Sequence, residues 1–193
     1  MFFSHYDKET GYKKVLKDHL IEVLENTRAI LKDVPIKSEY EANIKKMCEI
    51  AAVTHDFGKY TSFFQKYLHT GEKSDLKQHS FISALFGAYL LFSIKEEWGP
   101  NFPYAELILY EAILHHHGNL KLISDDVVPK RIILRGDPHS LANRINILTE
   151  QIKDMRECLP DIAQDLIPVL TKIQIGNKAI IEGFFEHWLD TMD

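Results

Sequence analysis

The sequence predicts an all-α domain, and three observations support this prediction. Hydrophobic residues recur at helical spacing nearly throughout the chain, alternating strand patterns are nearly absent, and Gly and Pro mark the ends of the helical stretches. Hydrophobic residues make up 45% of the 193 residues and charged residues 26%, which excludes a disordered chain, a collagen-like fibre or a disulfide scaffold. At this length we expect a single domain that covers residues 1–193.

The first two predicted helices, over residues 13–32 and 39–56, each carry one apolar stripe at helical spacing. Gly58 stops the second helix soon after its last apolar turn. A further turn or two of helix is predicted over residues 62–68. The two stripes consist of Leu16, Leu20, Val23 and Leu24, and of Ile44, Met47, Cys48 and Ala51.

The middle of the chain predicts a buried central helix over residues 79–97, because this stretch is apolar on nearly every side. Residues 104–117 form the next predicted helix, which is again apolar on several faces and is closed by Gly118. Residues 119–139 contain Pro and Gly and are predicted to be irregular, with room for a short strand at 131–134.

A clean apolar seam predicts a helix over residues 140–159. Pro160 and Pro168 are then expected to break the helical pattern. The chain closes with a predicted helix over residues 178–192, which again has an apolar face.

The composition points to a cytoplasmic protein without a membrane segment. The longest largely apolar stretch spans nine residues, against the roughly 20 that a bilayer-crossing helix needs, and the N-terminus turns polar at its fourth residue. Cys48 and Cys158 show no paired spacing, so both are expected to be reduced. A net charge of −5 argues against a broad basic surface for duplex DNA, but it is compatible with a single strand drawn into a metal-lined cleft.

Ten histidines are the unusual feature of the composition, because His is the commonest transition-metal ligand. His55 and Asp56 stand at the predicted end of a helix, where adjacent side chains can reach one cation although they point about 100° apart. An imidazole nitrogen beside a carboxylate oxygen suits Mn, Fe, Co, Ni or Zn. Lys59 follows within one helical turn, where only an anionic substrate would offset its repulsion by the metal.

The other candidate histidines are ambiguous when they are taken singly. His19 faces the core side of its helix and His79 heads the central helix, and each position alone is more typical of a hydrogen-bonded core or helix-start residue than of a ligand. Residues 115–117 are three consecutive histidines at a helix end, which the helix dipole favours. Imidazoles at the end of an apolar helix are costly unless something binds them, so the triplet favours metal binding.

Four short segments together resemble a known family. THDFGK, FFQKYL, KQHSFISA and LHHHG, preceded by an opening SHYDKETG and LKDHL, resemble the HD nuclease domain of the CRISPR-associated (Cas) helicase–nuclease of type I systems, a member of the HD superfamily. The resemblance covers residues 4–118 and is far more specific than the His-Asp pair alone. It implies a compact all-α HD-domain bundle with a buried metal site.

The resemblance also implies a set of site residues. Gly118 fixes the register of the His-His-Gly motif and leaves His115 outside it, while Lys59 takes the place of the family's lysine and acts with Asp56 in catalysis. The implied ligands are His19, His55 and Asp56 for one metal, with Asp56 bridging to a second metal at His79, His116 and His117.

The chain departs from the family at the last ligand. The family closes its first metal site with an aspartate on a later helix, and no such context is clear after Gly118. Asp190 and Asp193 are the nearest candidates, although solvated carboxylates on a last turn are the simpler interpretation of both. The alternative that the domain ends before this ligand-bearing helix stays open.

The function implied by the resemblance is metal-dependent endo- or exonuclease cleavage of single-stranded DNA in type I CRISPR interference, an antiviral defence. The implied partners are the single strand, a helicase domain or subunit, and the CRISPR surveillance complex. The nitrogen-rich ligand set favours one or two ions of Mn, Ni, Co or Fe over Mg. Four aromatic residues after the His-Asp pair offer stacking faces for bases, but their helical spacing favours core packing: Tyr60, Phe63, Phe64 and Tyr67.

Two other functions stay open from the sequence. One is an HD phosphohydrolase that acts on nucleotides or cyclic nucleotides. The other is a catalytically weak scaffold that keeps the histidines as a structural metal site. Turnover of single-stranded DNA, of mononucleotides only, or of neither would separate the three.

Overall fold

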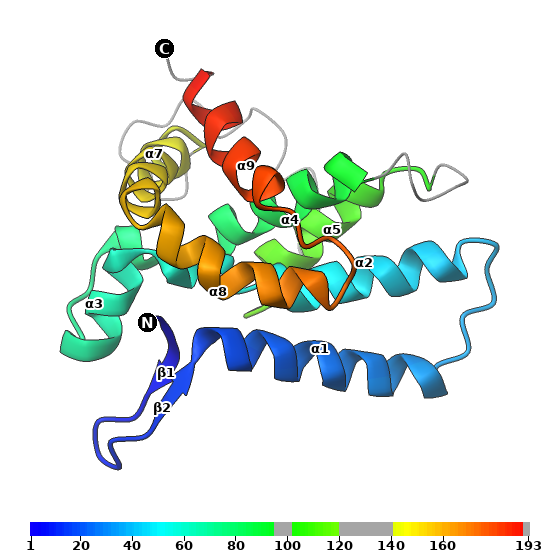
Figure 1. Ribbon diagram of the computed structural model, residues 1–193, viewed down its shortest axis with the longest axis horizontal. Helices are drawn as coiled ribbons and strands as arrows, with labels where there is room; N and C mark the ends of the chain where they lie inside the picture. Colours follow the sequence, from blue (N-terminus) through cyan, green and yellow to red (C-terminus); the bar gives the residue numbers. More distant parts are fainter. Residues whose placement is uncertain (95–101, 120–140, 191–193) are drawn as a thin grey trace.

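A long antiparallel helix pair forms one side of the molecule. The computed structural model describes residues 1–94, 102–119 and 141–190, and in it α1 (Leu16–Asp33) and α2 (Glu41–Thr54) lie against each other (Figure 1). The predicted stripe of α1 faces inward, because Leu16, Leu20 and Leu24 are fully buried. The pair directs the C-terminal end of α2 into the middle of the bundle.

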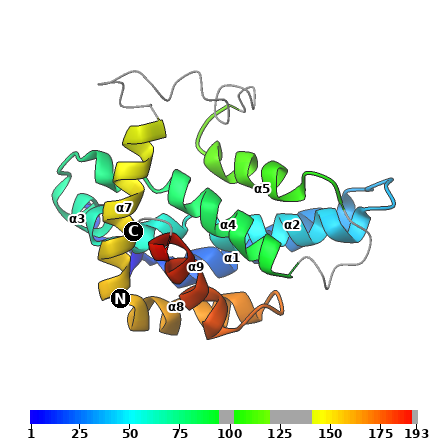
Figure 2. The same ribbon diagram turned by 90° about the horizontal axis from the view of Figure 1, so that it is seen from above.

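Helix α4 (Ser80–Ile94) runs through the middle of the fold, as the sequence predicts, with α5 (Ala105–Leu114) beside it (Figure 2). It contacts α2, α5, α7 and α9. At Gly87 a Cβ atom would lie 2.5 Å from Ile113 and 2.9 Å from Thr54, so the glycine lets α2, α4 and α5 approach closely. The ends of α2 and α5 that carry histidines are therefore held together.

The last three helices are α7 (Leu141–Glu157), α8 (Leu159–Thr171) and α9 (Lys178–Asp190). The predicted break at Pro160 is found, because α7 ends at Glu157 and α8 begins at Leu159, but the predicted break at Pro168 is wrong. Pro160 falls in the first turn of α8, where a backbone N–H has no helical partner, and Pro168 is accommodated inside the helix. The apolar face of α8 is buried in the core and consists of Ile162, Ala163, Leu166, Val169 and Leu170.

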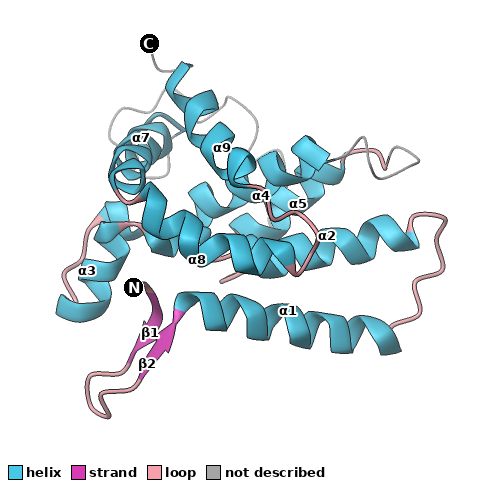
Figure 3. Ribbon diagram, in the orientation of Figure 1, coloured by secondary structure: helices cyan, strands magenta, loops and turns pink. Residues whose placement is uncertain are grey.

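A small β-hairpin at the N-terminus was not predicted. Strands β1 (Phe3–Tyr6) and β2 (Lys13–Val15) pair antiparallel and are drawn in magenta in Figure 3. The turn between them is closed by the Asp7 carboxylate, which accepts hydrogen bonds from Glu9 and Thr10. Strands this short carry too few residues for an alternating pattern to stand out.

Three short helical segments connect α2 to α4. They are the 3-10 turn η1 (Phe57–Tyr60), helix α3 (Ser62–Thr70) and the 3-10 turn η2 (Asp75–Lys77). Helix α5 ends at Leu114, three residues earlier than the predicted helix over 104–117. The predicted irregular segment and short strand fall almost entirely within residues 120–140, which the structure does not describe. The predicted helix ends at 95–97 and 191–192 also lie outside the described residues.

Among the helices that the structure describes, none combines the length and the apolar character that a bilayer crossing needs. Cys48 and Cys158 are both free thiols.

Candidate metal centre

His55 and Asp56 lie at the junction between α2 and η1. His55 is the C-terminal cap of α2 and still has helical backbone angles, whereas Asp56 has already left the helix and caps η1. This change of backbone direction brings both side chains to the same side of the helix end. The Asp56 side chain is nearly fully buried, with the residue 1% exposed.

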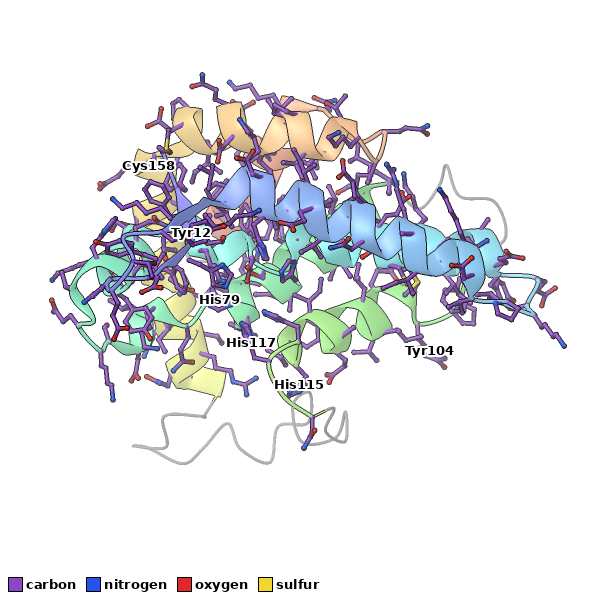
Figure 4. All side chains as sticks on the ribbon, turned by 90° about the horizontal axis from the view of Figure 1, so that it is seen from below. Tyr12, His79, Tyr104, His115, His117 and Cys158 are labelled. Atoms are coloured by element: carbon purple, nitrogen blue, oxygen red, sulfur yellow. The ribbon has the colours of Figure 1, made fainter. Side chains whose placement is uncertain are left out.

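Imidazoles from three other elements converge on the Asp56 carboxylate. His19 comes from α1, His79 immediately precedes α4, and the pair His116 and His117 follows α5. Figure 4 shows His79 and His117 pointing toward each other, and their Nε2 atoms are 3.0 Å apart. The Nε2 atoms around the carboxylate lie 3.1 Å (His19) and 3.4 Å (His55) from Oδ2, and 3.2 Å (His79) and 3.6 Å (His116) from Oδ1.

The two carboxylate oxygens therefore face two different groups of imidazoles. In each group the potential ligand atoms lie within 4.8 Å of one another. The structure brings together all six side chains that the sequence singled out as ligands, and Asp56 is the one shared by both groups. The groups are His19, His55 and Asp56, and Asp56, His79, His116 and His117.

Backbone carbonyls fix the tautomers of two of these imidazoles. Nδ1 of His55 lies 3.0 Å from the carbonyl oxygen of Ala52, and Nδ1 of His116 lies 2.6 Å from that of Ile113. A carbonyl oxygen only accepts, so each Nδ1 carries the proton and donates it. In the neutral imidazole the lone pair is then on Nε2, the atom that faces Asp56.

The Nε2 lone pairs of His55 and His116 face the Asp56 carboxylate and repel it, so no hydrogen bond forms between these groups. Asp56 Oδ1 and His116 Nε2 are both buried, and within the described residues neither has a hydrogen-bond partner. Such orphaned polar atoms are costly in a protein interior. A cation between them would satisfy both, so the donor set fits a divalent metal.

The charge states of the site also suit metal binding. Burial lowers the pKa of His55 and His117 to about 4 each, and it lowers the pKa of His79 below its ordinary value. These imidazoles are therefore neutral at pH 7 and available as donors.

Lys59 reaches the same carboxylate from η1. Its Nζ lies 2.8 Å from Asp56 Oδ2 and donates to the carbonyl oxygen of Ser4 in β1 at 3.4 Å. The ammonium also lies 5.2 Å from the centre of the Phe64 ring, and the residue is only 4% exposed. The unpredicted hairpin thus helps to hold the lysine that the sequence assigned to catalysis.

Gly58 of the THDFGK motif and Ser83 of the KQHSFISA motif have structural roles that the sequence did not reveal. A Cβ atom on Gly58 would lie 2.6 Å from the carbonyl oxygen of His79 and 2.5 Å from Ile82, so only glycine lets η1 pack against the start of α4. The Gly58 N–H donates to Ser83 Oγ at 2.8 Å. These contacts set the position of His79 relative to Asp56.

His115, whose role the sequence left open, is not part of either group. Its Nε2 lies 3.6 Å from the Glu111 carboxylate one turn back in α5. His5 in β1 was not singled out from the sequence, although its ring centre is 5.3 Å from that of His19. The proximity of His5 to the site follows from the contact between β1 and α1, which the sequence pattern did not predict.

The last family ligand is not located. The group at His19, His55 and Asp56 holds three side chains within the part of the chain that the structure describes. The side chain of Asp190 and the whole of Asp193 lie outside that part.

A helical bundle with histidines gathered around a buried aspartate defines a metal-binding α-helical domain. The HD domain family matches residues 16–155, which is most of the chain, and the chain belongs to this family. HD domains are typically metal-dependent phosphohydrolases that bind divalent metals. Searches of curated proteins and of solved structures return no match to this chain.

Proposed function

We propose that this HD domain is a metal-dependent phosphodiesterase that hydrolyses single-stranded DNA. The observation that supports metal-dependent hydrolysis is the buried Asp56 carboxylate, which faces the lone pairs of His55 and His116 from its two oxygens. A divalent cation would satisfy these atoms, and HD domains are typically phosphohydrolases that use such cations. The choice of DNA rests on the resemblance of the motifs THDFGK, KQHSFISA and LHHHG to the Cas nuclease domain.

In this proposal His19 and His55 hold one ion with Asp56, while His79, His116 and His117 hold a second one with the same aspartate. When bound, a divalent ion supplies Lewis-acid activation of a water nucleophile and neutralises charge on the phosphoryl oxygens. The carbonyls of Ala52 and Ile113 keep two of the imidazoles in one tautomer and one orientation.

Lys59 contributes a fixed positive charge beside the reacting phosphate. Its ammonium is held between the Asp56 carboxylate and the Ser4 carbonyl, and the residue lines an open groove next to His79. A buried ammonium that is already oriented needs no reorganisation when charge develops on the phosphoryl oxygens. Asp56 and Lys59 are therefore the residues to which we assign catalysis.

The ligand chemistry selects among metals. Five imidazoles and one carboxylate make a nitrogen-rich set, whereas Mg²⁺ prefers oxygen ligands and retains its waters. We expect Mn, Ni, Co or Fe to support activity better than Mg.

The resemblance extends the proposal to partners. A helicase domain or subunit would deliver the single strand, and the CRISPR surveillance complex would recruit both in type I interference. The net charge of −5 supports delivery by a partner, because the domain lacks the excess of positive charge that captures duplex DNA unaided.

The deciding experiment measures metal content and hydrolysis together. We expect protein loaded with Mn²⁺ to cleave a labelled single-stranded oligonucleotide, and Asp56→Ala to leave the strand intact. Release of phosphate from mononucleotides without strand cleavage would instead support the nucleotide phosphohydrolase. Stoichiometric metal without any hydrolysis would support the structural scaffold.

A further inference from the structure

A groove with a volume of about 520 Å³ lies beside the second group of ligands. His79 and His117 form part of its wall, together with the catalytic Lys59. Its volume is within the range of about 300–1,000 Å³ that small-molecule sites occupy. A substrate phosphate at the metals would therefore have the rest of the molecule in this groove.

The groove carries positive charge in a protein that is negative as a whole. Lys59, Lys77 and Arg144 line it, and none of the described residues in its wall is Asp or Glu. The chain holds 28 acidic residues against 23 basic ones, so a wall with three basic residues and no acidic one departs from the average composition. Lys59 is already paired with Asp56, which lies outside this wall, so the part of the groove away from the metal centre is lined by Lys77 and Arg144. A cleft lined by one sign of charge concentrates ligands of the opposite sign.

Aromatic rings hold the two outer cations in place. The Lys77 ammonium lies 4.2 Å from the centre of the Tyr67 ring, and the Arg144 guanidinium lies 5.8 Å from that of Phe81. Within the described residues no carboxylate pairs with Lys77. A ring face attracts a cation without neutralising it, so the Lys77 charge remains available to an anion.

The two cations and the two rings that they contact come from four separate elements. Tyr67 belongs to α3, Lys77 ends η2, Phe81 is in the first turn of α4, and Arg144 is in α7. Tyr67 and Phe81 are half-buried, in contrast to Phe64, which is packed in the core. Alternating cations and partly exposed rings are the combination that binds the phosphates and bases of a single strand.

We propose that this groove is a strand-binding subsite, in which Lys77 and Arg144 bind backbone phosphates next to the scissile one. Tyr67 and Phe81 offer faces to the neighbouring bases. The proposal rests on the proposed function, because it places the scissile phosphate at the metal centre. It deepens that function by requiring a substrate with more than one phosphate along a chain, which a mononucleotide lacks.

The test measures binding in the absence of cleavage. The whole chain is mixed with a fluorescently labelled oligothymidylate of about 12 nucleotides in chelator, and anisotropy gives the affinity at several salt concentrations. Lys77→Gln and Arg144→Gln are each expected to weaken binding and to reduce the salt dependence by about 0.7 in log–log slope, the value for one phosphate contact on a single strand. Lys73→Gln and Arg156→Gln are the matched controls, because both replace exposed cations near the same segments.

Tyr67→Leu separates stacking from charge. It is expected to weaken binding without a change in the salt slope, because a ring face contacts a base and no phosphate. Circular dichroism checks that each variant is folded, and only folded variants are compared.

An unchanged slope in both Lys77→Gln and Arg144→Gln would overturn the proposal, and so would competition by thymidine monophosphate that equals that of the strand. These outcomes are distinct from failure of the proposed function. Strand cleavage by wild-type protein with unchanged slopes rejects the subsite alone. Binding that depends on both cations, without hydrolysis under any metal, rejects the nuclease alone.

Discussion

Asp56 organises the centre because its two oxygens face different imidazoles. Oδ2 faces His19 and His55, and Oδ1 faces His79 and His116. A carboxylate in this position can bridge two cations, since each oxygen has its own set of nitrogen donors. No other side chain in the described part of the chain belongs to both groups.

The first prediction follows from this bridging position. Asp56→Ala removes the oxygen ligands of both groups, so strand cleavage is expected to fall to background and bound Mn²⁺ to be lost. The helical content should stay nearly unchanged, because the cost falls on metal binding. Metal analysis, a cleavage assay and circular dichroism check this, with Asp161→Ala as a control at an exposed carboxylate in α8. Full activity in Asp56→Ala would remove this residue from the site.

Lys59 is expected to act on the substrate more than on the metal. Lys59→Ala should lower turnover by about 100-fold, the effect of losing one pre-oriented charge or donor at a transition state. Metal content should be nearly unchanged, since an ammonium has no lone pair to offer. Turnover and metal analysis of the same preparation test this, and Lys66→Ala on the exposed face of α3 is the control. Loss of metal would show that Lys59 supports the ligands instead.

At the scale of elements, the close approach of η1 to α4 sets the site geometry. A side chain at Gly58 would push against the backbone of His79 at 2.6 to 2.8 Å, and backbone cannot yield as a flexible side chain does. The hydrogen bond from Gly58 to Ser83 fixes the same contact from the other side. The second metal group therefore depends on an interhelical contact as well as on its ligands.

Gly58→Ala is the corresponding test. The expected cost is about 1–3 kcal/mol of folding free energy, as for other overpacked sites, together with displacement of His79 and weaker binding at the second group. Denaturant unfolding and metal titration measure the two effects. Gly118→Ala serves as the control, because a Cβ there meets no atom within 4 Å. Equal stability and equal metal binding in the two variants would contradict this role of Gly58.

The elements also show what the sequence could and could not predict. Helical periodicity located the helices around the site, and motif spacing singled out the six side chains that lie together, from His19 to His117. Local patterns failed for the hairpin β1–β2, whose strands are too short, and for α8, where burial of an apolar face outweighs the cost of Pro168. The groove residue Arg144 was also missed, because only tertiary packing brings α7 beside η2 and α4.

At the scale of the whole molecule, metal should stabilise the fold. The site joins α1, the α2–η1 junction, the start of α4 and the segment after α5, so a bound ion links four distant segments. At a metal concentration 100 times the Kd, the folded state gains about 2.7 kcal/mol. For a chain of this length we expect Tm to fall by roughly 5–10 °C when chelator removes the metal. Calorimetry with and without chelator measures this, and Asp56→Ala should show no such difference.

The same imidazoles make the metal-free protein sensitive to acid. Because the pKa of His55 is about 4 in the folded protein and 6.5 when it is unperturbed, the unfolded state binds more protons between these values. The pKa of His79 is lowered in the same direction. The stability of chelated protein should therefore be fully present above about pH 6.5 and decline as pH falls toward 4. Thermal unfolding in chelator across this range gives the slope.

Replacement of His55 isolates its share of this effect. His55→Gln keeps a side chain that can donate to the Ala52 carbonyl but does not titrate, so the decline of Tm with acid should become shallower. His69→Gln, at an exposed imidazole in α3, is the control and should leave the slope as in the wild type. An identical slope in His55→Gln and wild-type protein would mean that His55 is already charged in the folded state. A charged His55 has no lone pair on Nε2, and it could then not be the neutral donor that the metal centre requires.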